Sequence, residues 1–325
     1  MRRFCFIVCL ACLLGSCKNG KPDVSGIDLS IDIQRLDRDI FDMTVNSLSD
    51  KYGVFFDYYT DGILNIGNCK DSLFSEYLEM FKSDSIVRVA YNDVNKIYPD
   101  LKNLTNKLTS AFKYYRYYFP DKDIPKIYTY ISGFNQSVIL ADGILAIGLD
   151  KYLGADYELY NSLRFYKYLS QNMYPEKIVS DYIETWIGNA WELNTRKNND
   201  LISKMLFEGK ILYATKMILP DETDVNIFGF TPAQLRWCRN NEKTMWTTLI
   251  ENKLLFSTDS FMIRKLTDFA PYTAEFTAES PGKACNWIGF NIIAKYMQNH
   301  PHISLNELMN NDDYHKIFEQ AKYKP

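Results

Sequence analysis

Apolar and polar residues alternate near the start of the chain. Ile27, Leu29, Ile31 and Ile33 are apolar, and each residue between them is polar. Apolar residues at every second position indicate a strand with one buried face. We therefore expect a half-buried β-strand that begins at Ile27.

Residues 35–120 show a different period. Their apolar residues recur at steps of three and four, most clearly over 72–81 and 101–118. This spacing is typical of amphipathic helices, and Pro99 and Pro120 provide boundaries. A helical layer is expected to follow the first strand.

The period changes again between residues 124 and 149. The stretches 124–131 and 138–149 are rich in β-branched and aromatic residues, with Gly133 and Gly143 as breaks, so they predict a small β-sheet. After Asp150 the helical period continues to the end, and prolines interrupt it at Pro175, Pro220, Pro232, Pro271, Pro281 and Pro301. The predicted fold class is α+β, mostly helical with a small β-sheet.

The first sixteen residues have the pattern of a signal peptide. Arg2 and Arg3 precede an apolar run over 4–14, which is shorter than the about 20 residues that a membrane-spanning helix needs. The sequence Leu14-Gly15-Ser16-Cys17 then resembles the lipobox of bacterial lipoproteins. That resemblance implies removal of residues 1–16 and acylation of Cys17, the lipid-attachment site. The alternative is an ordinary cleaved signal peptide in which Cys17 has no role.

Lipidation at Cys17 would attach the protein to a lipid bilayer. A diacylglyceryl group and an amide-linked chain such as palmitate together suffice for stable anchoring. Residues 17–26 are polar and contain Gly and Pro, so we expect a flexible tether, followed by a single domain over 27–325. Lys18 follows the cysteine, where an Asp would suggest retention in the inner membrane. We expect attachment to the outer membrane, facing the periplasm.

Composition narrows the possible functions. The chain is 46% hydrophobic, which is enough for a large core, and without Arg2 and Arg3 its net charge is −5. The acidic balance and the lack of a basic stripe argue against a nucleic-acid partner. The chain has 24 Tyr and 20 Phe, several of them within 114–119. We expect these aromatic residues to pack in the core, although a ligand-stacking groove is the alternative.

Three cysteines remain after lipidation and cleavage, at Cys69, Cys238 and Cys285. They cannot all pair, and no C-x-x-C spacing occurs. An exported protein can form one disulfide, but we expect three buried thiols.

Few residues suit catalysis. The only histidines are His300, His302 and His315, and no Gly-x-Ser-x-Gly or H-E-x-x-H motif and no glycine-rich phosphate loop occurs. We predict no cofactor and no catalytic site, and His300 and His302 are expected to be surface residues rather than zinc ligands.

Acidic residues are the remaining candidates. Asp181 and Glu184 lie one helical turn apart, and Glu192 is expected on the same helix. Acidic helix faces are usually solvated, whereas a glycosidase-type site needs two carboxylates across a cleft.

Several segments in order resemble the gliding-motility lipoprotein GldB family of Bacteroidota. They are Ile33 to Phe41, Phe207 to Ala214, Gly229 to Cys238, Asn241-Glu242 with Trp246, Leu254-Leu255, Glu279 to Lys283 with Trp287 and Gly289, and Tyr323-Lys324-Pro325. No single segment is specific, but their order and spacing are.

The family also resembles zincin-type metallopeptidases, which implies a zincin-like architecture. In such enzymes a small sheet precedes a helix with two zinc-binding histidines, and a later helix supplies a glutamate. The corresponding helix here, about 175–191, has no histidine, so the resemblance implies a degenerate site without metal. Asp181, Glu184 and Glu208 would be residues of a vestigial cleft, and we expect a structural role for Glu208.

The resemblance implies a membrane-anchored periplasmic lipoprotein without catalytic activity, which supports an envelope assembly of the gliding-motility or secretion type and has envelope proteins as partners. One alternative is a hydrolase-like enzyme that uses Asp181, Glu184 or Glu208. Another is a module that binds peptide or glycan.

Overall fold

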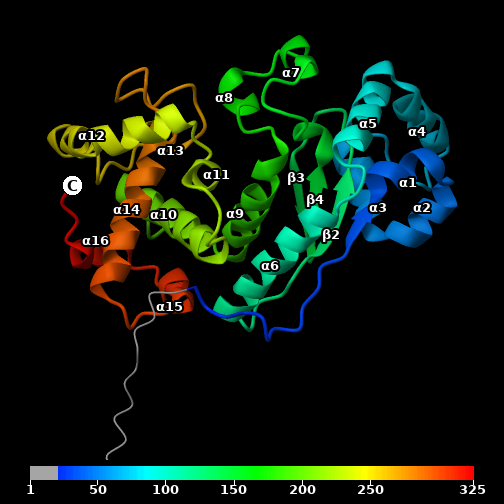
Figure 1. Ribbon diagram of the computed structural model, residues 1–325. Coiled ribbons are helices and arrows are strands. Elements are labelled where there is room, and N and C mark those ends of the chain that lie inside the picture. The colour runs from blue at the N-terminus through cyan, green and yellow to red at the C-terminus, as the bar shows by residue number, and fades with distance from the viewer. Residues whose placement is uncertain (1–20) are drawn as a thin grey trace, which may run out of the picture.

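The computed structural model describes residues 21–325 (Figure 1). The predicted signal peptide and Cys17 lie outside these residues. In the described part of the chain, no helix is both long enough and apolar enough to cross a membrane.

The first described segment is extended, but it forms less sheet than the alternation predicts. Asp28, Ser30 and Asp32 are exposed and Ile31 is buried, as expected for one buried face. The strand β1, however, covers only Ile33–Arg35, so the prediction of a strand from Ile27 was wrong. The reason is that the preceding residues contact a helix: the backbone N–H of Ile31 donates to the Thr109 hydroxyl (3.1 Å).

Four strands form one sheet in the order β1-β2-β4-β3. β1 pairs in parallel with β2 (Lys126–Tyr130), β2 pairs in parallel with β4 (Ile144–Gly148), and β3 (Val138–Ala141) pairs antiparallel with β4 at the edge. The small sheet expected between residues 124 and 149 is confirmed.

The two faces of this sheet are covered by different helices. Tyr128, Tyr130 and Ala146 belong to a core with the first helices of the chain, whereas Leu145 and Ile147 belong to the larger core with the later helices. Side chains of successive strand residues point to opposite faces, so each strand is divided between two cores. This arrangement explains why the strands are apolar throughout rather than alternating.

Between β1 and β2 the chain forms helices and one π-helical turn. They are α1 (Leu36–Asp42), α2 (Val45–Tyr52), α3 (Val54–Asp57), the turn η1 (Tyr58–Ile63), α4 (Phe74–Ser83), α5 (Ser85–Ile97) and α6 (Lys102–Tyr118). In Figure 1, α1 to α5 lie on the right of the sheet and α6 crosses in front of it. The helical layer predicted over 35–120 is confirmed.

The rest of the chain is helical after β4. The elements are the 3₁₀ turns η2 (Leu149–Lys151) and η3 (Pro175–Lys177), and the helices α7 (Glu158–Ser162), α8 (Lys167–Ser170), α9 (Ile178–Ala190), α10 (Leu201–Ile218), α11 (Asp224–Phe228), α12 (Pro232–Glu251), α13 (Ser260–Thr267), α14 (Ala284–Asn299), α15 (Leu305–Asn310) and α16 (Tyr314–Ala321). The α+β class is therefore confirmed, with helices predominating.

Helices α9 and α10 connect the sheet to the C-terminal helices. Figure 1 shows α9 beside the sheet, with α10 and then α14 farther to the left. α10 is buried on most sides, including residues as different as Met205, Gly209 and Lys210. A helix surrounded in this way is part of the core rather than a surface element.

Candidate functional site

Helix α9 has one face against the sheet and one face toward α10. Tyr182, Ile183 and Ile187 are buried, and the Tyr182 hydroxyl donates to the Leu145 carbonyl of β4 (2.9 Å). This contact fixes the rotation of the helix. Asp181 and Glu184 lie one turn apart on a different side of α9, and both line an open cleft.

Two connected cavities form this feature, which we call the α9/α10 cleft. The outer cavity, of about 560 Å³, contacts residues of α9 and α10, and the inner cavity, of about 250 Å³, extends toward α8 and α14. The outer cavity is lined by Asp181, Glu184 and Glu208 together. The three carboxylates that sequence analysis selected therefore share one cleft. Five residues line both cavities: Ser137, Tyr152, Asp181, Glu184 and Phe269.

Asp181 is held by two neighbours. Its carboxylate forms an ion pair with the buried ammonium of Lys177, one turn earlier, and accepts a hydrogen bond from the Tyr152 hydroxyl (2.9 Å). Burial alone lowers the pKa of Lys177, but the charges of Asp181 and Glu184 outweigh it and raise that pKa. Asp181 is therefore a paired carboxylate with a defined orientation.

Glu208 is paired in the same manner on α10. Its carboxylate lies 2.5 Å from the Lys204 ammonium, one turn earlier on the same helix. Pairs at this spacing are common on helices and stabilise them slightly. The structural role expected for Glu208 agrees with this geometry.

Glu184 differs from the other two carboxylates. In the described residues it has no hydrogen-bond or ion-pair partner, although Lys283 and Lys177 are near enough to lower its pKa. Burial outweighs these lysines and, with help from the charges of Asp181 and Glu208, raises the pKa of Glu184 above its ordinary value. Glu184 is thus a carboxylate that faces the cleft without a direct partner.

Lys283 approaches the cleft from the start of α14. Its left-handed backbone (φ 52°) directs the chain into that helix, and the residue is only 8% exposed. The ammonium lies 4.2 Å from the centre of the Phe269 ring, a cation–π contact. Phe269 itself is 60% exposed, so an aromatic ring at the rim of the cleft covers a buried cation.

The histidines lie away from this cleft. His315 Nε2 is 2.7 Å from the Asp200 carboxylate, and His300 Nδ1 is 2.8 Å from the Tyr296 carbonyl. Across residues 21–325 no group of three or more His, Cys, Asp or Glu side chains is arranged to hold a metal ion. None of the described residues that line the cleft is a histidine or a cysteine.

Glu192 lies outside the helix on which it was expected. Glu192 is not on the helix of Asp181 and Glu184, because α9 ends at Ala190 and Trp191 has an extended backbone. Glu192 is exposed beyond that end and lines neither part of the cleft.

The three cysteines of the described residues, Cys69, Cys238 and Cys285, are free thiols. Cys238 and Cys285 are buried as expected, but Cys69 is only half-buried. Burial raises the pKa of Cys238 to about 12, so its thiol is not a nucleophile at neutral pH.

The aromatic segment at 114–119 mainly packs. Tyr115 and Phe119 are buried, and their ring centres are 5.2 Å apart. Core packing, the expected role, therefore accounts for Tyr115 and Phe119, whereas Tyr117 is exposed.

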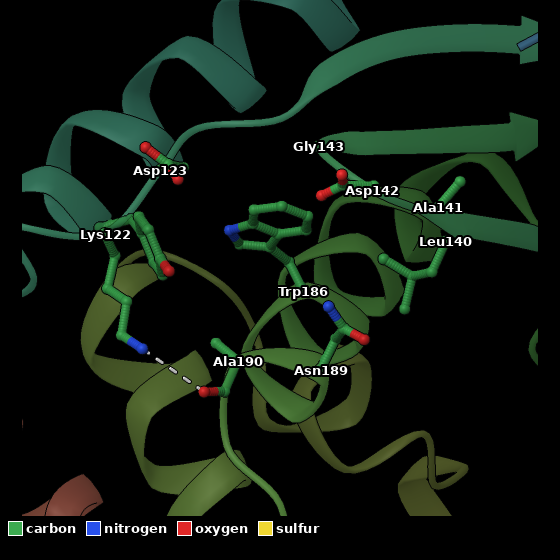
Figure 2. Close-up of a pocket in the computed structure, with 10 residues that line it drawn as sticks. Lys122, Asp123, Leu140, Ala141, Asp142, Gly143, Trp186, Asn189 and Ala190 are labelled. Atoms are coloured by element: carbon green, nitrogen blue, oxygen red, sulfur yellow. Dashed lines mark hydrogen bonds between the residues drawn. The ribbon is translucent and has the colours of Figure 1, made fainter. Parts of the chain in front are cut away.

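A separate cavity of about 510 Å³ lies at the far end of α9 (Figure 2). The Trp186 ring forms its floor between Asp123 and Asp142, and the Lys122 ammonium donates to the Ala190 carbonyl (3.5 Å). The lysine that lines this cavity, Lys122, is half-buried, whereas Lys151, Lys177 and Lys283 of the α9/α10 cleft are buried.

The lysines that pair with the carboxylates of the cleft were not predicted from the sequence. Lys177 and Lys204 each lie four residues before their acidic partners, so helical spacing would have revealed both pairs. Lys283 and Tyr152 had no such signal, because the fold alone brings them to α9.

The family model described as "Gliding motility protein GldB" matches residues 17–325. No curated protein and no solved structure matches the chain, so the zincin-like architecture stays a prediction.

Proposed function

Because the chain belongs to the gliding motility protein GldB family, we propose that it is a lipid-anchored protein of the cell envelope with a role related to gliding motility. In this proposal the protein supports an assembly of envelope proteins and catalyses no reaction. The bilayer is its first partner, through acylated Cys17, and the proteins of the assembly are the others.

The extent of the family match is the observation that carries this proposal. The match begins at Cys17, the residue that the lipobox predicts to be the first of the mature chain, and leaves out the predicted signal peptide. The matched range is the chain that would remain after cleavage at the predicted lipobox, and this agreement supports the proposal.

The attachment would keep the fold near the membrane surface. Residues 17–26 can span at most about 35 Å when fully extended. The Lys21 ammonium also forms an ion pair with Asp221, in the turn after α10. With Lys18 rather than Asp after the cysteine, we place the anchor in the outer membrane, facing the periplasm.

The pairing of the carboxylates supports a non-catalytic role. A general acid or base must reach the substrate and exchange a proton with it. Asp181 and Glu208 are each occupied by a lysine on the same stretch of chain. Only Glu184 is left without a direct partner, and one such group does not provide the two carboxylates that glycosidase-type hydrolysis needs.

Lipidation and location can be tested in cells that produce the full chain. An alkyne-tagged palmitate should label the wild-type protein and not Cys17→Ala, and the label should appear in the outer-membrane fraction. Equal labelling of both proteins would overturn the anchor site.

The scaffold role needs a second experiment. Crosslinking in intact cells, followed by purification from membranes, should recover the same envelope proteins with the wild type and lose them with Cys17→Ala. Cells with Cys17→Ala should also move less. If no protein is specifically recovered, the support role fails. If the purified chain hydrolyses cell-wall peptides or glycans and Glu184→Gln removes that activity, the non-catalytic role fails.

A further inference from the structure

Lys283 is unusual among the buried lysines of the described chain. Buried charges are normally paired or hydrogen-bonded, because an isolated charge in the interior is costly. Three of the four buried lysines follow this rule: Lys177 pairs with Asp181, Lys210 donates to two backbone carbonyls, and Lys151 donates to one. Within residues 21–325, Lys283 has no hydrogen bond and no ion pair, and its ammonium contacts the ring of Phe269.

Glu184 is the matching exception among the carboxylates of the cleft. Glu184 and Lys283 both line the inner cavity, and Lys283 is the charge that lowers the pKa of Glu184 most. They nevertheless form no ion pair within 4.0 Å. A buried lysine and a half-buried glutamate thus line the same cavity without pairing with each other. We call this space the Glu184–Lys283 gap.

The charges around the gap limit what can fill it. A simple anion would meet Glu184 and Asp181, and a simple cation would meet Lys151, Lys177 and Lys283, all of which line the inner cavity. A ligand with one charge would therefore pair with one group and be repelled by another. A ligand that carries both an ammonium and a carboxylate can pair with Glu184 and with Lys283 at the same time.

The size and the walls of the inner cavity indicate what else the ligand has. Its volume of about 250 Å³ is below the usual range for drug-sized ligands, about 300–1,000 Å³. Leu169, Met173 and Phe269 line it, so the walls also offer apolar surface. The outer cavity, which shares five residues with the inner one, gives a route of entry.

We propose that the Glu184–Lys283 gap binds a small zwitterionic ligand of the amino-acid type. Its ammonium would donate to the Glu184 carboxylate, its carboxylate would accept from the Lys283 ammonium, and an apolar side chain would contact Leu169 and Met173. This binding function goes beyond the proposed envelope role and does not depend on membrane attachment.

Equilibrium dialysis of the purified full-length lipoprotein tests the proposal. The protein in detergent is dialysed against an equimolar mixture of the twenty protein amino acids and their D-enantiomers, and the retained compounds are identified by mass spectrometry. We expect retention of one or more apolar amino acids in unchanged form. Retention of none would overturn the proposal, because water alone would then fill the gap.

The charge requirement is tested with analogues of each retained amino acid. The corresponding amine, without its carboxylate, and the corresponding acid, without its ammonium, should each bind roughly 30-fold more weakly or not at all, the effect of removing one partner of a buried charge pair. Analogue binding equal to that of the amino acid would overturn the zwitterionic assignment.

Protein variants locate the site. Lys283→Met and Glu184→Gln should each weaken retention by a similar factor, and Glu192→Gln, an exposed carboxylate outside the cleft, should not. Lys283→Arg keeps the charge and should bind more tightly than Lys283→Met. Circular dichroism of each variant checks folding. If both folded cleft variants retain the amino acid as well as the wild type, the site lies elsewhere and the proposal fails.

Discussion

Gly209 of α10 and Gly289 of α14 meet backbone to backbone. A Cβ atom built on Gly209 would come within 2.4 Å of the Gly289 carbonyl carbon, and one built on Gly289 would come within 1.9 Å of the Met205 carbonyl oxygen. Neither position has room for a Cβ atom, because the nearest atoms belong to the backbone of the facing helix and cannot move aside as a side chain could. The two glycines therefore set the distance at which these helices cross.

We expect Gly209→Ala and Gly289→Ala to destabilise the protein despite the better helix propensity of alanine. The helices must separate to admit a methyl group, and such overpacking typically costs about 1–3 kcal/mol or more. Chemical denaturation measures the loss. Gly188→Ala on α9 is the matched control, because its nearest atom beyond the helix is the end of the Ile211 side chain at 3.7 Å. That variant should be neutral or gain up to about 1 kcal/mol.

A second prediction concerns Asp150 at the end of β4. One of its carboxylate oxygens accepts the backbone N–H groups of Ser132 (2.9 Å) and Phe134 (2.7 Å). Burial outweighs these hydrogen bonds and raises the pKa of Asp150 to about 6, from an ordinary value of 3.8. A raised pKa means that the ionised form is disfavoured in the fold, so stability is lost as the pH rises from about 4 through 6.

Asp150→Asn should remove this pH dependence, because an amide oxygen can accept both backbone bonds without ionising. Between pH 4 and pH 7 the free energy of unfolding of the wild type should fall by about 2–3 kcal/mol relative to the variant. Denaturation curves at several pH values measure the difference. Parallel pH profiles of the two proteins would contradict the prediction.

Glu184 gives a third prediction, on stability in the absence of ligand. Its pKa is raised by burial, so ionisation costs free energy in the fold, and that cost grows as the pH rises above the ordinary value of 4.5. Glu184→Gln should therefore raise the melting temperature at pH 7 and have little effect at pH 4. Glu208→Gln is the contrasting variant, since it breaks the pair with Lys204 and should cost about 0.3–0.5 kcal/mol. A lower melting temperature for Glu184→Gln at pH 7 would disprove the assignment.

The fourth prediction concerns metal content. The cleft contains no histidine or cysteine and pairs two of its three carboxylates with lysines. Zinc sites in proteins usually need three or four nitrogen, sulfur or oxygen ligands from the chain. Elemental analysis of the purified mature protein should therefore find zinc well below one equivalent. One equivalent that survives dialysis against a chelator would refute this expectation.

The regular elements could be predicted because their signal is local. The apolar period located the helices over 72–81 and 101–118 to within a few residues of α4 and α6. The strand expected from Ile27 failed for a non-local reason: its partner, β2, is aligned with residues 33–35, and the preceding residues lie against α6. Alternation showed which side is buried but not what covers it.

The residues of the cleft also differ in whether a local signal or only the tertiary structure brings them together. Asp181 and Glu184 share a helix face, and spacing alone placed them together. Their partners could not be found from the sequence, because Lys283 lies about a hundred positions farther along and reaches α9 only through the packing of α14. The charge balance of the cleft is thus a property of the tertiary structure.

The placement of β1 determines how a mechanical load would enter the molecule. The strand pairs in parallel with β2, so a pull on the residues before Ile33 acts along the strand and strains all its ladder hydrogen bonds at once instead of opening them one after another. Asp37, directly after β1, pairs with Arg35 and accepts a hydrogen bond from Thr129 of β2. Tension on the N-terminal segment is therefore carried into the middle of the fold, to the sheet against which α9 packs.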